Sequence, residues 1–137
     1  MAEFKLTISD PKTGLSIQRE AKEQAAQRFI GLKIGDKVKG EAIDLQGYEF
    51  EISGGSDYCG FPMRKDVQGL GRKKIMAVSG VGFHKKEKGI KQRKTVCGNT
   101  IHAKMAQINL KVTQEGKDRI FEGVGKKEKE TAAEKKE

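Results

Sequence analysis

Short stretches in which apolar and polar residues alternate are the feature that most restricts how this chain can fold. Phe4, Leu6 and Ile8 alternate with polar residues, which is the pattern of a strand with one buried face. Residues 10–14 read Asp-Pro-Lys-Thr-Gly, which is typical of a turn because proline fixes φ and glycine accepts positive φ. The alternation resumes at residues 15–17, so the first twenty residues predict a β-hairpin.

The remaining apolar runs are also short, and only one segment has the spacing of a helix. Residues 21–30 place alanines and Phe29 on one face, before Gly31, and predict a helix of about ten residues. Residues 75–78 are typical of a buried strand, and residues 101–112 alternate with one register change, which indicates a bulge. With 17 glycines in addition, the chain is expected to be mainly β, with α structure only in one short helix. We predict a small curved antiparallel sheet or a β-barrel-like domain.

We predict a single domain over residues 1–124. A chain of 137 residues can bury one core, although 35% of its residues are hydrophobic and 34% are charged. Residues 125–137 have no apolar residue larger than alanine, so they predict a flexible charged tail. The sequence has no window of about 18 apolar residues and no signal-peptide core. We therefore expect a cytoplasmic protein with no membrane partner.

Positive charge is concentrated in the middle of the chain. The sequence has 28 Lys and Arg against 19 Asp and Glu, a net charge of +9. Residues 61–104 alone have 12 basic and 2 acidic side chains, a net charge of +10, whereas residues 1–60 have a net charge of −2. A concentrated basic segment attracts a polyanion, so we expect a nucleic-acid surface here. The alternative is a solvated basic face without a partner. A membrane-surface helix fits poorly, because the glycines in the segment would break an amphipathic helix.

The candidate RNA-binding residues form two groups. One group flanks predicted strands, and the other lies in a long basic loop over residues 82–99, which we expect to order on RNA phosphates. A lysine-rich loop favours charge neutralisation over sequence readout. Phe83 and His84 are candidates to stack on an unpaired base, although Phe83 alternatively anchors the loop to the core. The candidates are Arg64, Lys65, Arg72, Lys73, Lys74, Phe83, His84, Lys85, Lys86, Lys88, Lys91, Arg93, Lys94 and Lys104.

The most specific local motif spans residues 52–63, Ile-Ser-Gly-Gly-Ser-Asp-Tyr-Cys-Gly-Phe-Pro-Met. It predicts a strand end that runs into a constrained loop. Asp57 is placed to accept backbone N–H bonds two residues on, and Pro62 sets the direction in which the chain leaves. On physical grounds alone, a shaped β-connection without chemistry explains the motif. Its defining positions are Gly54, Gly55, Asp57, Gly60, Pro62 and Met63.

This motif closely resembles the signature of the S-six-e family of small-subunit ribosomal proteins (eS-six) from archaea and eukaryotes. The resemblance covers about residues 3–123, and further matching positions are Gly47, Tyr48, Phe50, Gly71, Arg72, residues 93–98, Asn109 and Leu110. It implies a structural protein of the small ribosomal subunit that binds small-subunit rRNA, contacts neighbouring ribosomal proteins and has a barrel-like core. Eukaryotic members carry a phosphorylated serine cluster in a long C-terminal helix. The last serine here is Ser79, so the sequence resembles the short archaeal form.

Two other functions remain as alternatives. A small phosphate-binding enzyme would use the Gly54-Gly55 loop to hold a phosphate, with Asp57 or His84 reacting. A free RNA chaperone or translation regulator would bind RNA only transiently. The sequence has no P-loop motif and no local arrangement typical of a nucleophile. We therefore expect a protein that is not an enzyme and has no small-molecule substrate.

The sequence also gives little support for a metal site. Cys59, Cys97, His84 and His102 are the residue types that bind zinc, but no Cys-x-x-Cys pair is present. Free thiols in a reducing compartment explain the two cysteines more simply. We expect no metal and no cofactor.

Overall fold

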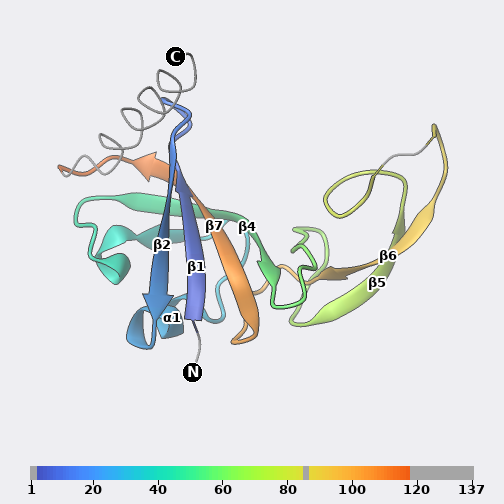
Figure 1. The fold of residues 1–137 in the computed structure, drawn as a ribbon, viewed down its shortest axis with the longest axis horizontal. Coiled ribbons are helices and arrows are strands. Elements are labelled where there is room, and N and C mark those ends of the chain that lie inside the picture. Colours follow the sequence, from blue (N-terminus) through green and yellow to red (C-terminus); the bar gives the residue numbers. More distant parts are fainter. Residues whose placement is uncertain (1–2, 85–86, 118–137) are drawn as a thin grey trace, which may run out of the picture.

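The computed structural model describes residues 3–84 and 87–117, and the strands and helices of this part follow one another as shown in Figure 1. They are β1 Glu3–Ser9, β2 Ser16–Lys22, α1 Gln24–Phe29, β3 Lys37–Lys39, the 3-10 helix η1 Gly40–Ile43, β4 Glu49–Asp57, β5 Arg72–Ala77, β6 Gln92–Cys97 and β7 Met105–Gln114. The main sheet has the order β2-β1-β7-β4-β3, and β5 and β6 form a separate two-stranded ribbon. In the described part of the chain, a mainly β fold with one short α-helix is confirmed, as an open curved sheet and not as a closed barrel.

The predicted hairpin is the β1–β2 pair, and it forms one side of the main sheet. Phe4, Leu6 and Ile8 are buried, whereas Lys5 is exposed and Thr7 is half-buried. Asp10 closes the turn, because its Oδ1 accepts the backbone N–H of Lys12 at 3.0 Å. The other edge of β1 pairs with β7 in parallel, whereas the other strand pairs are antiparallel. A parallel pair needs a long connection, and nearly the whole described chain lies between these two strands.

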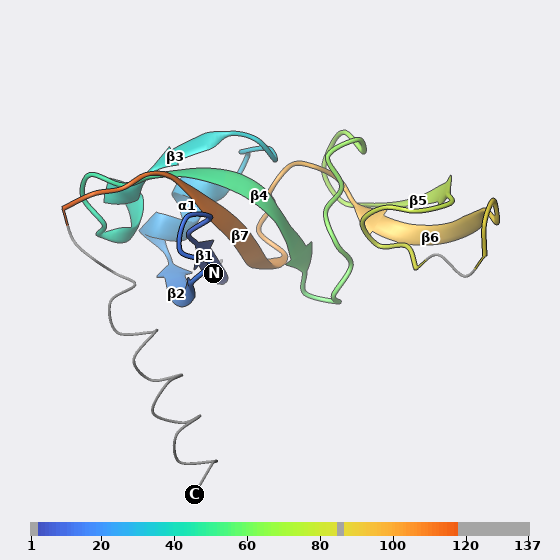
Figure 2. The ribbon, with the colours of Figure 1, turned by 90° about the horizontal axis from the view of Figure 1, so that it is seen from above.

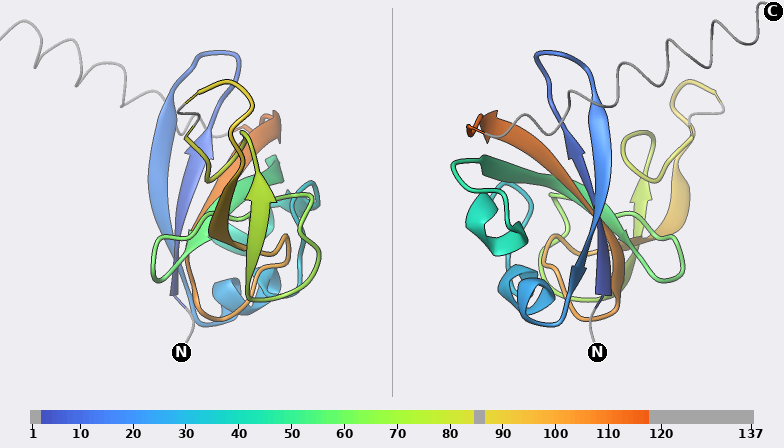
Figure 3. Two further views of the ribbon diagram at one scale, coloured as in Figure 1. Left: turned by 90° about the vertical axis from the view of Figure 1, so that its right-hand side faces the viewer. Right: turned by 60° about the vertical axis from the view of Figure 1, so that its left-hand side comes forward.

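The helix α1 is shorter than the predicted segment over residues 21–30. Ala21 belongs to β2 and pairs with Phe4, and Glu23 has a φ of +49°, which prevents an earlier helix start. Ala26 and Phe29 are fully buried in the main core, as the helical pattern predicted. Figure 3 shows α1 at the end of the sheet where β2 ends, opposite the β1–β2 turn.

The β4–β7 pair carries the predicted register change. Gly55 and Ser56 pair with successive residues of β7, but the next step leads from Ser56–Gln107 to Asp57–Met105. One residue of β7 is therefore left over in this step, as in a β-bulge, and bulges bend and twist a strand. In Figure 2, β4 and β7 run toward the β5–β6 ribbon, which lies beyond one end of the main sheet.

The ribbon corrects two sequence predictions. Residues 82–99 are not one loop, because residues 92–97 form β6 and pair with β5. The basic pattern hides this strand, since Val96 is one of its few apolar residues. Residues 75–78 are not a fully buried strand either, because Met76 is 66% exposed. A two-stranded ribbon has one covered face here, packed on a small cluster of Val67, Phe83 and Val96.

Two predictions fall on residues that the structure does not describe. These are the candidate contacts Lys85 and Lys86 and the tail over residues 125–137. The division into a domain at 1–124 and a tail therefore stays a prediction. Within residues 3–84 and 87–117, no helix is long and apolar enough to span a lipid bilayer.

Candidate nucleic-acid interface

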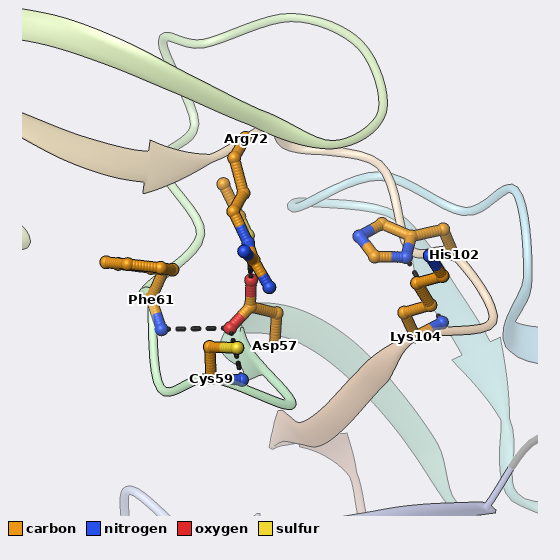
Figure 4. A network of polar contacts seen from close by, with 7 residues as sticks. Asp57, Cys59, Phe61, Arg72, His102 and Lys104 are labelled. Atoms are coloured by element: carbon orange, nitrogen blue, oxygen red, sulfur yellow. Dashed lines mark hydrogen bonds and ion pairs between the residues drawn. The ribbon is translucent and has the colours of Figure 1, made fainter.

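Asp57 is a buried carboxylate at the point where β4 ends and the chain leaves the main sheet. Its Oδ1 accepts the backbone N–H groups of Cys59 at 2.9 Å and Phe61 at 3.0 Å (Figure 4). Its Oδ2 accepts hydrogen bonds from Arg72 Nε at 2.7 Å and from the Cys97 thiol at 3.2 Å. Burial alone raises the pKa of Asp57, but these hydrogen bonds outweigh burial and hold the pKa below its usual value. The carboxylate is therefore ionised, and its hydrogen bonds to groups of the same chain give it a structural role.

Arg72 is the cation that balances Asp57, and it starts β5. Its guanidinium carbon lies 4.8 Å from the ring centroid of Tyr58 and 5.0 Å from that of Phe61. The hydrogen bond with Asp57 raises the pKa of Arg72. Its side chain is 34% exposed, and its charge is neutralised by a carboxylate of the same chain. The predicted RNA contact Arg72 thus serves first as a link between the two sheets.

Gly54 and Gly55 lie within β4 and not in a loop. They pair with Asn109 and Ile108 of β7, and neither glycine has a positive φ. A Cβ at position 55 would overlap the carbonyl oxygen of Gln107, whereas a Cβ at position 54 would have nothing within 4 Å. A backbone engaged in a sheet cannot wrap around a phosphate. The geometry therefore does not support an enzyme that holds a phosphate with these glycines.

The rest of the motif shapes the connection between the sheets. Gly60 has a φ of +87°, and its N–H donates to the carbonyl of Asp57 at 3.0 Å. The carbonyl of Pro62 accepts the N–H of Cys97 at 2.8 Å, and the Met63 side chain is buried in the main core. Residues 57–63 with Arg72 and Cys97 therefore form a joint that fixes the ribbon on the sheet. This arrangement agrees with the interpretation of the motif as a shaped β-connection.

Arg64 is a second arginine that the fold uses for structure. Its Nε and Nη2 donate to the two carboxylate oxygens of Asp66 at 2.9 and 2.8 Å, and its Nη1 donates to the carbonyl of Val81 at 3.0 Å. The bond with Asp66 raises the pKa of Arg64. The guanidinium also lies 5.5 Å from the ring centroid of Phe83, which is 8% exposed. Burial favours the interpretation of Phe83 as a loop anchor over base stacking.

The remaining basic candidates are exposed, and no ion pair involves them within the described part of the chain. They are Lys65, Lys73, Lys74, His84, Lys88, Lys91, Arg93, Lys94 and Lys104. Seven of them belong to β5, β6 or the loop between these strands, and we call the six lysines and arginines among these the ribbon cations. The ribbon cations are Lys73, Lys74, Lys88, Lys91, Arg93 and Lys94.

The pairing of β5 with β6 determines how the ribbon presents this charge. Residues directly opposite each other share a face, and Met76 lies opposite Arg93, while Lys74 lies opposite Thr95. Their face is open, because the other face carries the half-buried Ile75 and packs on the small cluster. Lys73 and Lys94 belong to that second face, opposite Val96 and Ile75, but both are exposed. A twisted ribbon with exposed cations has the shape and charge to follow a sugar-phosphate backbone.

Two residues beside the joint were not expected to belong to this surface. Tyr58 is 61% exposed although it contacts Arg72. His102 accepts the N–H of Lys104 through Nδ1 at 3.2 Å, and its enclosed Nε2 has no partner within the described residues. The only sequence signal for Tyr58 was its place inside the motif, and His102 was singled out only as a residue type that binds zinc. Among the described residues, no group of three or more His, Cys, Asp and Glu side chains is arranged for a metal ion.

A curved sheet, a rigid joint and a cationic ribbon define a small mainly β protein that holds a charged surface in a fixed position. The chain belongs to the family described as ribosomal protein S6e, whose family model matches residues 4–125. The resemblance inferred from the motif at residues 52–63 is therefore confirmed. The family consists of structural ribosomal proteins and not of enzymes.

Archaeal relatives are similar to the chain over most of their own length, and the following three carry the name small ribosomal subunit protein eS6. The one from Methanococcus maripaludis strain C5 is 45% identical over 113 residues, which are 82% of this chain and 89% of the relative. The one from Haloarcula marismortui is 44% identical over 125 residues, 91% of this chain and 97% of the relative. The one from Archaeoglobus fulgidus is 46% identical over 116 residues, which are 84% of this chain and 90% of the relative.

Proposed function

We propose that this chain is a structural component of the small ribosomal subunit that binds small-subunit rRNA and supports translation in the cytoplasm. The family and the names of the relatives support a place in the subunit. The exposed ribbon cations are the observation that supports contact with RNA. Neighbouring ribosomal proteins are its further partners in this proposal.

The ribbon cations would bind by neutralising phosphates and not by reading bases. Five of the six are lysines, which act as point charges and do not form the bidentate contacts of arginine. The two arginines with strong local partners, Arg64 and Arg72, would position the ribbon. Binding of this kind follows the shape of the RNA backbone.

The first test is the salt dependence of binding to a small-subunit rRNA transcript. With about six phosphate contacts, log K should fall against log salt with a slope of roughly −4 to −5. A triple variant of the ribbon, Lys74→Gln, Arg93→Gln and Lys94→Gln, should flatten this slope by about 2 to 3. The matched control removes three exposed lysines of the main sheet, namely Lys37→Gln, Lys39→Gln and Lys111→Gln.

The control should bind with nearly the wild-type slope. Affinity that is indifferent to salt between about 50 and 200 mM, or a ribbon variant that matches the control, would contradict the proposed contact.

A second test asks whether the protein stays in the subunit. It should co-sediment with archaeal small subunits and be released only at high salt. Recovery in the post-ribosomal supernatant would overturn the structural role. Exchange on and off the subunit during sedimentation would favour the RNA chaperone or regulator instead.

A further inference from the structure

A hollow of about 260 Å³ opens beside the joint, where three segments meet. These are the turn after β4, the start of β5 and the residues that precede β7. Its lining residues are Asp57, Tyr58, Gly71, Arg72, His102 and Lys104. Figure 4 shows Asp57 and Arg72 on one side and His102 and Lys104 on the other. Its volume is slightly smaller than that of ordinary ligand sites, which begin at about 300 Å³, so it suits one base and not a duplex.

Tyr58 gives this hollow an aromatic surface that is exposed and held in place. Its ring packs on the Arg72 guanidinium at 4.8 Å, and its backbone N–H donates to the carbonyl of Lys104 at 3.1 Å. Nevertheless the residue is 61% exposed. An aromatic ring fixed before binding loses little conformational entropy when a ligand packs on it.

The charge of the hollow favours an anion. Asp57 does not act as a hydrogen-bond acceptor for a ligand, because each of its two carboxylate oxygens already accepts two hydrogen bonds from the protein. Lys104 is exposed and has no ion pair within residues 3–84 and 87–117. His102 lines the hollow but does not offer its Nε2 to a ligand, because this atom is buried.

We propose that this hollow receives one unpaired nucleotide of the bound RNA, with its base against the Tyr58 ring and its phosphate beside Lys104. An aromatic face next to a cation binds single-stranded RNA with little dependence on sequence, because every base has a π-face. Bases within an RNA duplex are not available to a side chain in this way. The inference rests on the proposed function, because the ligand is a part of the same RNA.

Three substitutions at one position test the inference in the full chain. Tyr58→Phe keeps the ring and should bind the small-subunit rRNA transcript like the wild type. Tyr58→Ala should lower the affinity by about 5- to 150-fold, the range that loss of one stacked base gives. Tyr58→Leu still covers Arg72 with apolar atoms but cannot stack, so it should weaken binding as well. The salt slope should stay unchanged in all three, and thermal unfolding checks that each variant folds.

A second measurement needs no variant. Ultraviolet crosslinking of the wild-type protein bound to the small-subunit rRNA transcript, followed by mass spectrometry, should attach Tyr58 to an unpaired nucleotide. Equal affinities for wild type and Tyr58→Leu, or a Tyr58 crosslink to protein in the assembled subunit, would overturn the inference. In either case the ribbon-dependent salt slope would still support the proposed function. A wild-type protein that does not bind rRNA at all would overturn both.

Discussion

Nε of Arg72, the first residue of β5, donates a 2.7 Å hydrogen bond to Oδ2 of Asp57, the last residue of β4. The same carboxylate oxygen accepts the thiol of Cys97, the last residue of β6. One buried carboxylate thus holds both strands of the ribbon on the main sheet. The position of the ribbon cations relative to the main sheet therefore depends on this contact.

Replacing Asp57 by Asn should therefore destabilise the protein strongly. The amide keeps the size of the carboxylate but loses its charge and can no longer accept four hydrogen bonds. We expect the free energy of unfolding to fall by about 2–4 kcal/mol, as measured by urea denaturation. Asp66→Asn is the matched control, because Asp66 also pairs with an arginine but has a side chain that is 63% exposed. A loss at Asp57 no larger than that at Asp66 would contradict the role of the joint.

The lowered pKa of Asp57 predicts a loss of stability in acid. The unfolded chain binds the proton near the usual pKa of 3.8, whereas the folded chain binds it only at lower pH. The stabilising contribution is therefore complete above pH 3.8 and is lost as the pH falls through the lower folded value. Urea denaturation between pH 2 and 7 should show a steeper acid decline for wild type than for Asp57→Asn. Parallel curves for the two proteins would mean that the carboxylate is not held ionised in the fold.

The sequence was sufficient for the elements that depend on local patterns. The alternation of Phe4, Leu6 and Ile8 predicted β1, and the interrupted alternation before Ile108 predicted the bulge in β7. The motif at residues 52–63 predicted the family and a constrained connection. In each case the signal lies within about ten residues and reflects one buried face or one turn.

Long-range pairing was not visible in the same way. β6 was missed because its basic residues look like a loop until they pair with β5. The ion pairs of Arg64 and Arg72 were not foreseen, because their carboxylate partners are defined by the folded backbone and not by charge counting. Burial of Phe83 likewise depends on Val67 and on β6, which are distant in sequence.

The two cysteines should differ sharply in reactivity. Burial, and then the hydrogen bond to Asp57, raises the pKa of the Cys97 thiol to about 12, so at pH 8 only about 10⁻⁴ of it is thiolate. Cys59 is exposed. Iodoacetamide should therefore modify Cys59 alone in the native protein and both cysteines in urea, as read by mass spectrometry. Native Cys59→Ser should remain unmodified, and rapid labelling of Cys97 in that variant would mean that the joint opens in solution.

The adjacent glycines of the motif give the final prediction, because they differ in what surrounds them. Gly55→Ala places a Cβ against the carbonyl oxygen of Gln107 and 3.2 Å from the sulfur of Met63. The strand or the core must shift, which should cost about 1–3 kcal/mol of unfolding free energy. Gly54→Ala meets nothing within 4 Å at a φ that alanine tolerates, so its stability should stay within about 0.5 kcal/mol of wild type. Urea denaturation of the pair compares them directly. If Gly54→Ala proved the more harmful change, the close approach of β7 to Gly55 would not be what requires glycine here.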